Sequence, residues 1–288
     1  MILFSKQLLV KFFGAFISVL LSVLLIKFLG KDEFGKYSFY LSIINILTIV
    51  CLFGQPQVLI KSIPKITNLN KKLIEIDKSL LLIVRLTLFV FFIYLIIGLS
   101  TRNYLIIISS AAIIFLTLNK FRFLVYRVLN RPILSEFPDL ILKPIFLISL
   151  VLVIVKLGVN INSDLLFLLL SVTLISLLFI FQIKSKIFPN IFNYKARLKR
   201  GILLYSFPFF LFSLLNVFRE NLEIIFSPIY IEFSEVSILK IYLQFAMIIS
   251  YSLMAVNVSQ SVKISKALKL NQPHIIEKIL LKGMIFSL

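Results

Sequence analysis

The chain of 288 residues has few of the side chains that carry most enzyme chemistry. It contains one histidine (His274), one cysteine (Cys51), no tryptophan and twelve acidic residues. A lone cysteine cannot form an internal disulfide, and the sequence offers no clustered metal ligands, no Ser/His/Asp set and no glycine-rich phosphate loop. We therefore expect no catalytic residue, no metal site and no cofactor.

Apolar residues, in contrast, make up 60% of the chain, and its mean hydropathy is +1.06. Soluble domains carry about 45–50% apolar residues. The excess lies in long runs separated by short basic segments, and the runs do not alternate as barrel strands do. Because backbone groups in lipid must be satisfied internally, the runs should be helices. The sequence predicts an all-α, polytopic helical membrane protein.

Eight of these runs have nearly the length of about 20 residues that a helix needs to cross the hydrocarbon core. They cover residues 8–29, 37–60, 80–99, 104–121, 139–158, 164–183, 202–226 and 238–258. We expect residues 1–183 to form a first bundle of six spans, 184–201 a basic linker, and 202–288 the start of a second bundle. A last apolar run opens at Gly283, so we expect a fragment or a split gene product.

The formal net charge of +19 comes from basic residues that flank the apolar runs. A soluble basic domain is not indicated, so we expect no nucleic-acid partner. Of the 31 Lys and Arg residues, 22 are counted with one side of the predicted spans and seven with the other, including those near span ends, and two (Arg85 and Lys143) lie well inside spans. The positive-inside rule then predicts a cytoplasmic N-terminus.

Several polar residues recur at helical spacing within the predicted spans. Polar stripes in lipid must face protein or water, so they form interhelical hydrogen bonds or line a cavity. Small residues at the same spacing allow another helix to approach closely. The small-residue stripe is Gly14, Ser18 and Ser22, and the candidate cavity-lining residues are Ser38, Ser42, Asn45, Ser213, Asn216 and Glu220.

Three segments carry a resemblance to a known family. Residues 29–37 read LGKDEFGKY, residues 54–56 read GQP, and residues 204–208 read LYSFP. In this pattern the chain resembles the polysaccharide-export or O-antigen (Wzx-like) flippases of the MATE-like (MOP) superfamily. Members usually have two full bundles, whereas eight spans are predicted here. Members also often carry an acidic residue near the outer end of the seventh span, where Glu220 or Glu223 would stand.

The resemblance implies a multi-pass protein of the bacterial inner membrane that works without covalent chemistry. Its substrate would be an undecaprenyl-pyrophosphate-linked oligosaccharide, flipped for O-antigen, lipopolysaccharide or other cell-surface polysaccharide synthesis. Implied partners are membrane lipids and the glycan polymerase and chain-length proteins of the same pathway. Three alternatives stay open: an ion-coupled small-molecule exporter of the same superfamily, a membrane glycan polymerase or ligase, and a structural membrane subunit.

A pyrophosphate that leaves water needs cations early on its path. Arg85 and Lys143 lie inside predicted spans near the cytoplasmic side, and Arg122 and Arg127 lie at that mouth of the bundle. An arginine can hold phosphate oxygens bidentately, so Arg85 ranks above Lys143. The alternative is that both side chains snorkel to the membrane interface. We expect Arg85, if it binds substrate, to face Ser38 and Asn45.

Overall fold

The computed structural model describes residues 2–129, 131–185 and 201–248, and this part of the chain is helical, with no strand. It confirms the all-α class. The elements are α1 (Ile2–Leu29), α2 (Lys31–Leu52), α3 (Gln55–Ser62), η1 (Ile63–Lys65), α4 (Leu69–Ser100), α5 (Tyr104–Val128), α6 (Pro132–Phe137), η2 (Pro138–Leu142), α7 (Lys143–Lys156), α8 (Ser163–Ser185), α9 (Gly201–Phe226), η3 (Ser227–Ile229) and a helix over residues 233–248.

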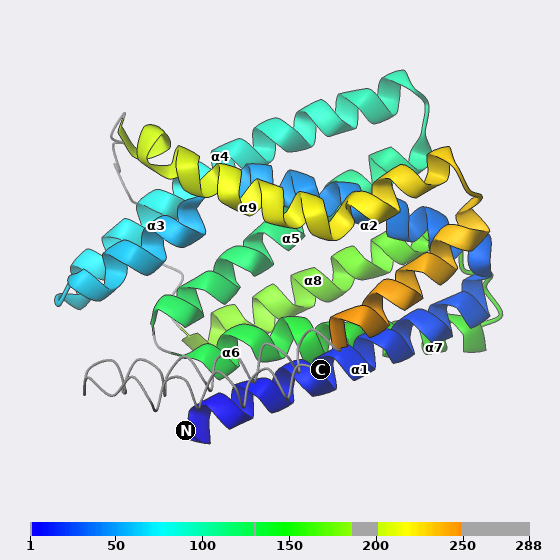
Figure 1. Ribbon diagram of the computed structural model, residues 1–288, viewed down its shortest axis with the longest axis horizontal. Coiled ribbons are helices and arrows are strands. Elements are labelled where there is room, and N and C mark those ends of the chain that lie inside the picture. Colours follow the sequence, from blue (N-terminus) through cyan, green and yellow to red (C-terminus); the bar gives the residue numbers. More distant parts are fainter. Residues whose placement is uncertain (1, 130, 186–200, 249–288) are drawn as a thin grey trace, which may run out of the picture.

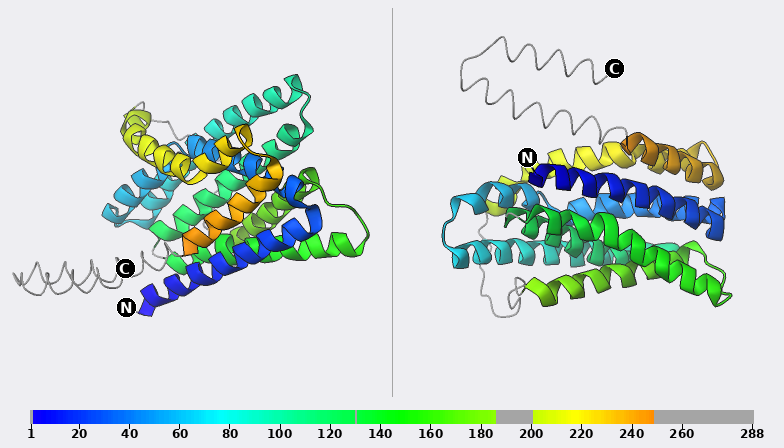
Figure 2. Two further views of the ribbon diagram at one scale, coloured as in Figure 1. Left: turned by 45° about the vertical axis from the view of Figure 1, so that its right-hand side comes forward. Right: turned by 90° about the horizontal axis from the view of Figure 1, so that it is seen from below.

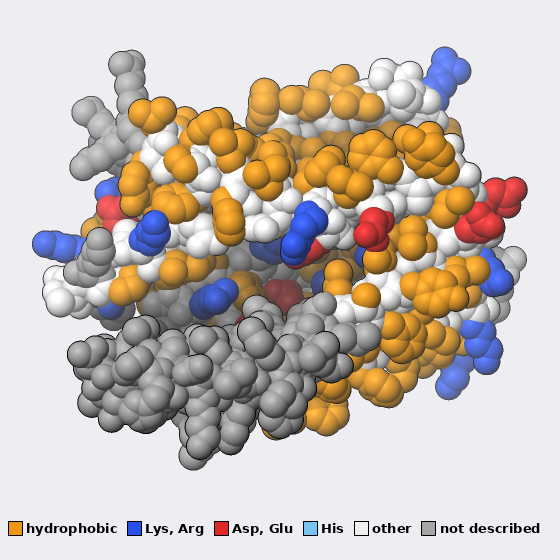
Figure 3. Space-filling view, viewed as in Figure 1, with side chains coloured by type: hydrophobic (Ala, Val, Ile, Leu, Met, Phe, Trp, Pro, Cys, Tyr) orange, Lys and Arg blue, Asp and Glu red, His pale blue; other side chains and the backbone are white. Residues whose placement is uncertain are grey.

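Within the described residues, six helices are long and apolar enough to cross a membrane. They are Leu9–Leu29, Lys31–Leu52, Asn70–Ser100, Tyr104–Val128, Leu134–Lys156 and Ser163–Ile180, which match the first six predicted spans. Large apolar side chains such as Phe16, Phe89 and Phe179 stand exposed on their outer faces. Apolar side chains also cover much of the face seen in Figure 3. Such surfaces suit lipid and not water, so the chain is a multi-pass membrane protein.

The structure corrects several predicted boundaries. The loop before the second span shrinks to Gly30, because α2 already begins at Lys31. The predicted span 37–60 is broken into α2 and α3 at Phe53 and Gly54. The basic segment around Leu73, which precedes the predicted third span, is helical and forms the first part of α4. The fourth helix runs on to Val128, so Lys120 and Arg122 lie inside a helix instead of a loop.

The predicted seventh span, 202–226, coincides with α9. This helix is not among the six most apolar ones, since Arg219, Glu220 and Glu223 lie in its second half, and its crossing of the membrane stays a prediction. The predicted eighth span starts five residues late, because its helix already begins at residue 233. Its remainder, most of the linker 184–201, and His274 lie outside the described residues, so the division into two bundles also stays a prediction.

Helix α5 lies at the centre of the bundle, packed against α2, α4 and α8. Figure 1 shows α1 and α7 at one edge and α4 at the other, with α9 lying across α2. Figure 2 shows that α9 and the helix 233–248 lie together on one side of the bundle. We call the end that contains Gly30, Asn103 and Ser163 the Gly30 end, and the opposite end the Gly54 end.

The break between α2 and α3 has a local cause. Phe53 and Gly54 both have left-handed backbone conformations, with φ of 40° and 68°. A side chain at Gly54 would also meet α9, since its Cβ would lie 2.4 Å from the carbonyl oxygen of Ser206. The Phe53 ring stacks on Phe210 at a centroid distance of 4.7 Å. Glycine is therefore required here both for the turn and for the close approach of α9.

The helical stretch from Pro132 to Lys156 contains one π-helical turn, η2, between α6 and α7. Helix α1 packs against this turn at Gly14, where a Cβ would lie 2.7 Å from that of Leu140. The predicted close approach at the small-residue stripe is thus confirmed for Gly14. Turns of this kind often occur at functional sites, because the extra residue re-aims the side chains around it.

Candidate functional site

A cavity of about 140 Å³ lies in the interior of the bundle, where the helix 233–248 faces α1, α2 and α7. Its wall combines polar and apolar side chains from six helices. The lining residues are Ser18, Leu21, Ser22, Leu25, Phe34, Tyr37, Ser38, Leu41, Asn45, Leu116, Lys143, Pro144, Leu147, Leu170, Lys240 and Gln244. Two of these side chains are basic, and none is acidic.

The two cations come from different parts of the chain. Lys143 is the first residue of α7, whereas Lys240 lies in the helix 233–248. Within the described residues, neither ammonium group forms a salt bridge. A cation without a counter-ion in a low-dielectric interior is costly. An anion in the cavity would offset that cost.

Polar atoms in the cavity wall also lack protein partners. The hydroxyl of Ser38 is buried, and neither its Oγ nor the Gln244 Oε1 has a hydrogen-bond partner within the described residues. Ser42, one turn further along α2, donates its hydroxyl proton to the Ser38 carbonyl at 2.9 Å and is satisfied locally. Buried polar groups are normally paired, so Ser38 and Gln244 are suited to a polar ligand or to water.

A second group of charges lies next to the cavity, toward the Gly54 end. The guanidinium of Arg122 donates to the Asp139 carboxylate at 3.2 Å and to the Leu177 carbonyl at 3.5 Å. Lys120 lies 3.4 Å from the side-chain oxygen of Asn45, which lines the cavity. The Asp139 carboxylate also interacts electrostatically with Lys120 and Lys143. Three cations thus share one carboxylate.

The Gly30 end is closed by contacts between α2 and later helices. Gly35 presses on the backbone of residue 233, since its Cβ would lie 1.8 Å from the Phe233 carbonyl oxygen. The Glu33 carboxylate accepts hydrogen bonds from the backbone N–H and hydroxyl of Ser163, at 2.9 and 2.7 Å. It also pairs with Lys36 at 3.0 Å.

The Gly54 end is closed by α3 and α9. Gln55 donates from its amide to the Ser206 hydroxyl at 2.8 Å, and both side chains are buried. The Lys61 ammonium lies 4.3 Å from the centre of the Phe209 ring. The cavity therefore lies between two zones where α2, its continuation α3, and the later helices touch.

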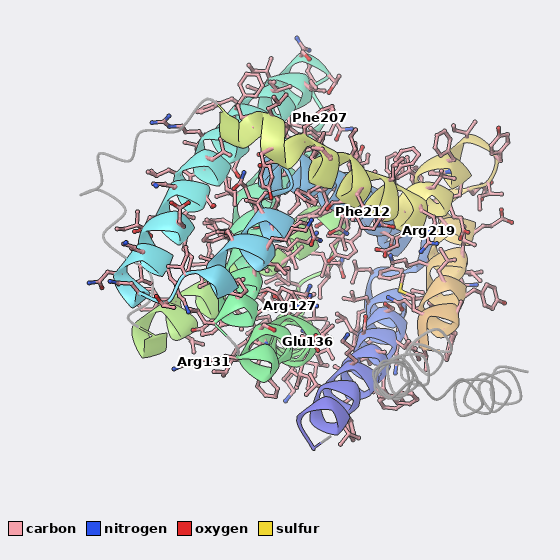
Figure 4. All side chains as sticks on the ribbon, turned by 60° about the vertical axis from the view of Figure 1, so that its left-hand side comes forward. Arg127, Arg131, Glu136, Phe207, Phe212 and Arg219 are labelled. Carbon is pink, nitrogen blue, oxygen red and sulfur yellow. The ribbon has the colours of Figure 1, made fainter. Side chains whose placement is uncertain are left out.

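The structure brings together only part of the predicted site. Lys143, Ser38 and Asn45 line one cavity, and Arg122 is buried beside it, 1% exposed. Arg85 stands exposed in the middle of α4 and does not line this cavity. Arg127 is exposed near the end of α5 and lies close to Glu136 in Figure 4. Their roles in substrate binding stay predictions.

The predicted stripe on α9 lies apart from the cavity wall. Ser213 and Asn216 are half-buried, and Glu220 is exposed but interacts electrostatically with Lys120. Figure 3 shows a hollow beside the band formed by α9, with basic and acidic side chains at its rim. Arg219 lies between α9 and the helix 233–248 in Figure 4. The stripe therefore faces, in part, other charged side chains.

Sequence reasoning missed Lys240, Lys120 and Asp139. Lys240 was counted with an outer loop because it lies only two residues after the start of the predicted eighth span (238–258), and Lys120 with a cytoplasmic loop because it lies one residue before the end of the predicted fourth span (104–121). The signal for Lys120 was the apolar run Phe121 to Val128, interrupted only by Arg122 and Arg127, which continues the helix. Nothing in the sequence distinguishes Asp139 from other carboxylates near helix ends.

Chemically, the arrangement suits reversible binding of an anion. The described residues contain no group of three or more His, Cys, Asp or Glu side chains that could hold a metal ion. The cavity offers two ammonium groups, a hydroxyl and amide groups, which can bind phosphate oxygens as point charges and hydrogen-bond partners.

The comparisons with known proteins are consistent with this arrangement. A family model described as "Polysaccharide biosynthesis protein" matches residues 5–261, which is most of the chain and includes every residue that lines the cavity. Neither the comparison with curated proteins nor that with solved structures found a match.

Proposed function

The chain belongs to the polysaccharide biosynthesis protein family, that of the Wzx-like flippases of the MOP superfamily, and on this premise we propose that it flips a lipid-linked oligosaccharide across the membrane. Membership confirms the resemblance seen in the sequence and supports polysaccharide-related membrane transport in general. The family is of the transporter type and not of a catalytic type. The specific substrate, an undecaprenyl-pyrophosphate-linked oligosaccharide, is our proposal.

The observation that carries the proposal is the pair of cations in the cavity. Lys143 and Lys240 line it without a salt bridge in the described part of the chain, and no acidic residue lines it. Intramembrane ionisable residues are costly and normally serve a function. A pyrophosphate supplies negative charge that can pair directly with both ammonium groups, and Asn45, Ser38 and Gln244 offer hydrogen-bond partners for its oxygens.

The two lysines also lie at different depths. Lys240 comes seven residues after the start of its helix at the Gly30 end, which is about 10 Å along the helix axis. Lys143 follows the π-helical turn and is electrostatically coupled to Asp139 and Lys120 on the side of the Gly54 end. An anionic head group could pass from Lys143 to Lys240 while the zones at the two ends open in turn, as in alternating access.

We further propose that the Gly54 end faces the cytoplasm of a bacterial cell and that the protein resides in the inner membrane. The asymmetry of Lys and Arg along the chain supports this orientation. Membrane lipids surround the exposed apolar faces. A glycan polymerase and chain-length proteins of the same pathway would take over the flipped product.

Reconstitution of the full chain in liposomes tests the proposal. The probe is a fluorescent short-chain polyprenyl-pyrophosphate disaccharide, whose arrival in the opposite leaflet is measured. Lys143→Gln and Lys240→Gln should each lower the rate about tenfold or more, because each removes a charge that binds the pyrophosphate. Lys156→Gln is the matched control, since Lys156 lies exposed at the other end of α7.

Arg85→Gln tests the remaining sequence prediction in the same assay. If Arg85 takes part in binding, the flipping rate of Arg85→Gln should fall as much as that of Lys143→Gln, at equal protein levels. Wild-type rates in both lysine variants would contradict the proposed site. No flipping by the wild-type chain, with a verified intact fold, would contradict the proposal that this chain flips the substrate by itself, whereas flipping would contradict the expectation that it is a fragment.

A further inference from the structure

We infer that Asp139 is the internal counter-ion of Lys143, one of the two lysines that line the cavity, and of Lys120 beside it, and that it limits how tightly the transported anion is held. It would be a positioning residue, which acts on the substrate through Lys143 and Lys120 and not by contact. This inference rests on the proposed function, because it concerns the anion that the cavity binds.

The position of Asp139 is fixed by its contact with Arg122. The Arg122 guanidinium is 1% exposed and donates to the Asp139 carboxylate at 3.2 Å. A second donor nitrogen of Arg122 lies 3.5 Å from the carbonyl oxygen of Leu177 on α8. Arg122 on α5 thereby links the carboxylate on η2 to α8, and the carboxylate cannot turn away to solvent without leaving a buried cation.

The same carboxylate acts on one lysine that lines the cavity and on one beside it. Lys143 lines the cavity, and Lys120 lies 3.4 Å from the side-chain oxygen of Asn45, another lining residue. Both ammonium groups interact electrostatically with Asp139. Asp139 does not line the cavity itself. It therefore lowers the positive potential of the cavity without occupying it.

The π-helical turn supports a specific role for this position. Asp139 is the second residue of η2, and Lys143 follows the turn directly. Turns of this kind are uncommon and often mark functional sites, because they place side chains where a regular helix would not. Here the turn sets the positions of both Asp139 and Lys143, the lysine whose charge the Asp139 carboxylate offsets.

A carrier must release what it binds. Sites that pass ions or charged groups must bind firmly enough to admit them and weakly enough to let them leave. Lys120, Arg122 and Lys143 with no carboxylate between them would hold a pyrophosphate strongly. With Asp139 present, the bound anion competes with an internal carboxylate for the same lysines, so that release toward Lys240 costs less.

Binding of inorganic pyrophosphate to the purified full chain, measured by calorimetry in detergent, tests the inference. Asp139→Asn keeps an oxygen that can accept the hydrogen bond from Arg122 but removes the negative charge. Its Kd should fall about tenfold, because one opposing charge near the site is gone. Glu136→Gln is the matched control, since Glu136 lies three residues earlier and pairs with Lys11 at 3.6 Å, away from the cavity.

The outcomes separate this inference from the proposed function. If wild type and all variants fail to bind pyrophosphate, the anion site itself is wrong. If wild type binds and Lys143→Gln weakens binding, but Asp139→Asn binds no more tightly than wild type, Asp139 is not the counter-ion. Equal tightening by Glu136→Gln would also overturn the inference, because a general change of charge would then explain it.

A second variant keeps the test valid if Asp139→Asn does not fold. Arg122→Met combined with Asp139→Asn replaces the buried pair by neutral side chains, which proteins often tolerate. Lys143 is still released from the Asp139 charge, so binding should be tighter than in wild type, although less so than in Asp139→Asn. Binding weaker than wild type in this folded double variant would contradict the inference.

Discussion

The side-chain amide of Gln55 donates a hydrogen bond of 2.8 Å to the hydroxyl of Ser206, although 151 residues separate them in the chain. Both residues belong to segments on which the family resemblance rested, GQP and LYSFP. The bond joins α3 to α9 at the Gly54 end, next to the stacked rings of Phe53 and Phe210. Two sequence motifs thus form one contact between the early and late helices.

Ser206→Ala should weaken this contact. The buried amide of Gln55 would lose its acceptor, which costs about 1–3 kcal/mol. We expect a lower free energy of unfolding in detergent, followed by circular dichroism. The control is Ser213→Ala, about two helical turns further along α9, where the side chain is half-buried. Equal loss of stability in the two variants would show that the Gln55 bond contributes nothing specific.

Gly35→Ala should open the Gly30 end. The new Cβ would lie 1.8 Å from the Phe233 carbonyl oxygen, so α2 and the helix 233–248 must separate. The test is cross-linking between Phe39→Cys and Phe233→Cys in a Cys51→Ser background, because these rings lie 5.9 Å apart in the closed arrangement. The yield of cross-linked protein should be lower when Gly35→Ala is added than in the parent.

Gly158→Ala is the control for this cross-linking experiment. Unlike Gly35, Gly158 has a positive φ, of 73°, and open space around it, so alanine adds only local backbone strain. Its cross-linking yield should equal that of the parent. An unchanged yield in Gly35→Ala would mean that the two helices can close without the glycine contact.

Glu33→Ala should detach the start of α8 from α2. The carboxylate accepts two hydrogen bonds from Ser163, and hydrogen bonds to charged groups contribute about 1.5–3 kcal/mol. Hydrogen exchange at the first turn of α8 should therefore become faster. Asp32→Ala is the comparison, since Asp32 is largely exposed and, in the part of the chain that the structure describes, its one salt bridge is with Lys36 at 2.6 Å. Equal effects of both variants would assign the stabilisation to Lys36 instead of Ser163.

The topology can be tested without a structure. Reporter fusions after about residues 70, 130, 190 and 270 should report the cytoplasm, and fusions near 33, 101, 161 and 232 the outer side, because basic residues favour the cytoplasmic face. Two or more consistent reversals would contradict the predicted orientation. A reversal only after residue 226 would show that α9 does not cross the membrane.

Hydropathy predicted the helical class and six spans because lipid demands long apolar helices whatever their detailed packing. It misplaced the ends wherever a charge lies inside a helix. Lys120 and Arg122 read as a loop, yet the first contacts Asn45 and the second Asp139, both of which depend on the three-dimensional arrangement. The break at Gly54 was missed for a similar reason, since its need for glycine comes partly from α9.

The site was predictable only in part. Ser38 and Asn45 were found because helical spacing places them on one face of α2. Lys143 was found because it is a cation within an apolar run. Arg85 met the same criterion, but no sequence pattern tells which face of α4 it occupies, and in the structure it is exposed. Lys240 belongs to the cavity only because the helix 233–248 packs back onto the first helices.

The π-helical turn at Pro138–Leu142 gives this segment one residue more than a regular helix needs to cover the same angle. Successive residues of an α-helix are about 100° apart around its axis. Losing one residue inside the turn would let it close into a regular helix with little net rotation of α7. Losing one residue from the regular part of α7 would instead rotate every residue beyond it by about that angle, and side chains that α7 now buries would face lipid. Relatives that share this cavity should therefore keep the length of α7 itself, and a length change of one residue in this segment should fall in the turn.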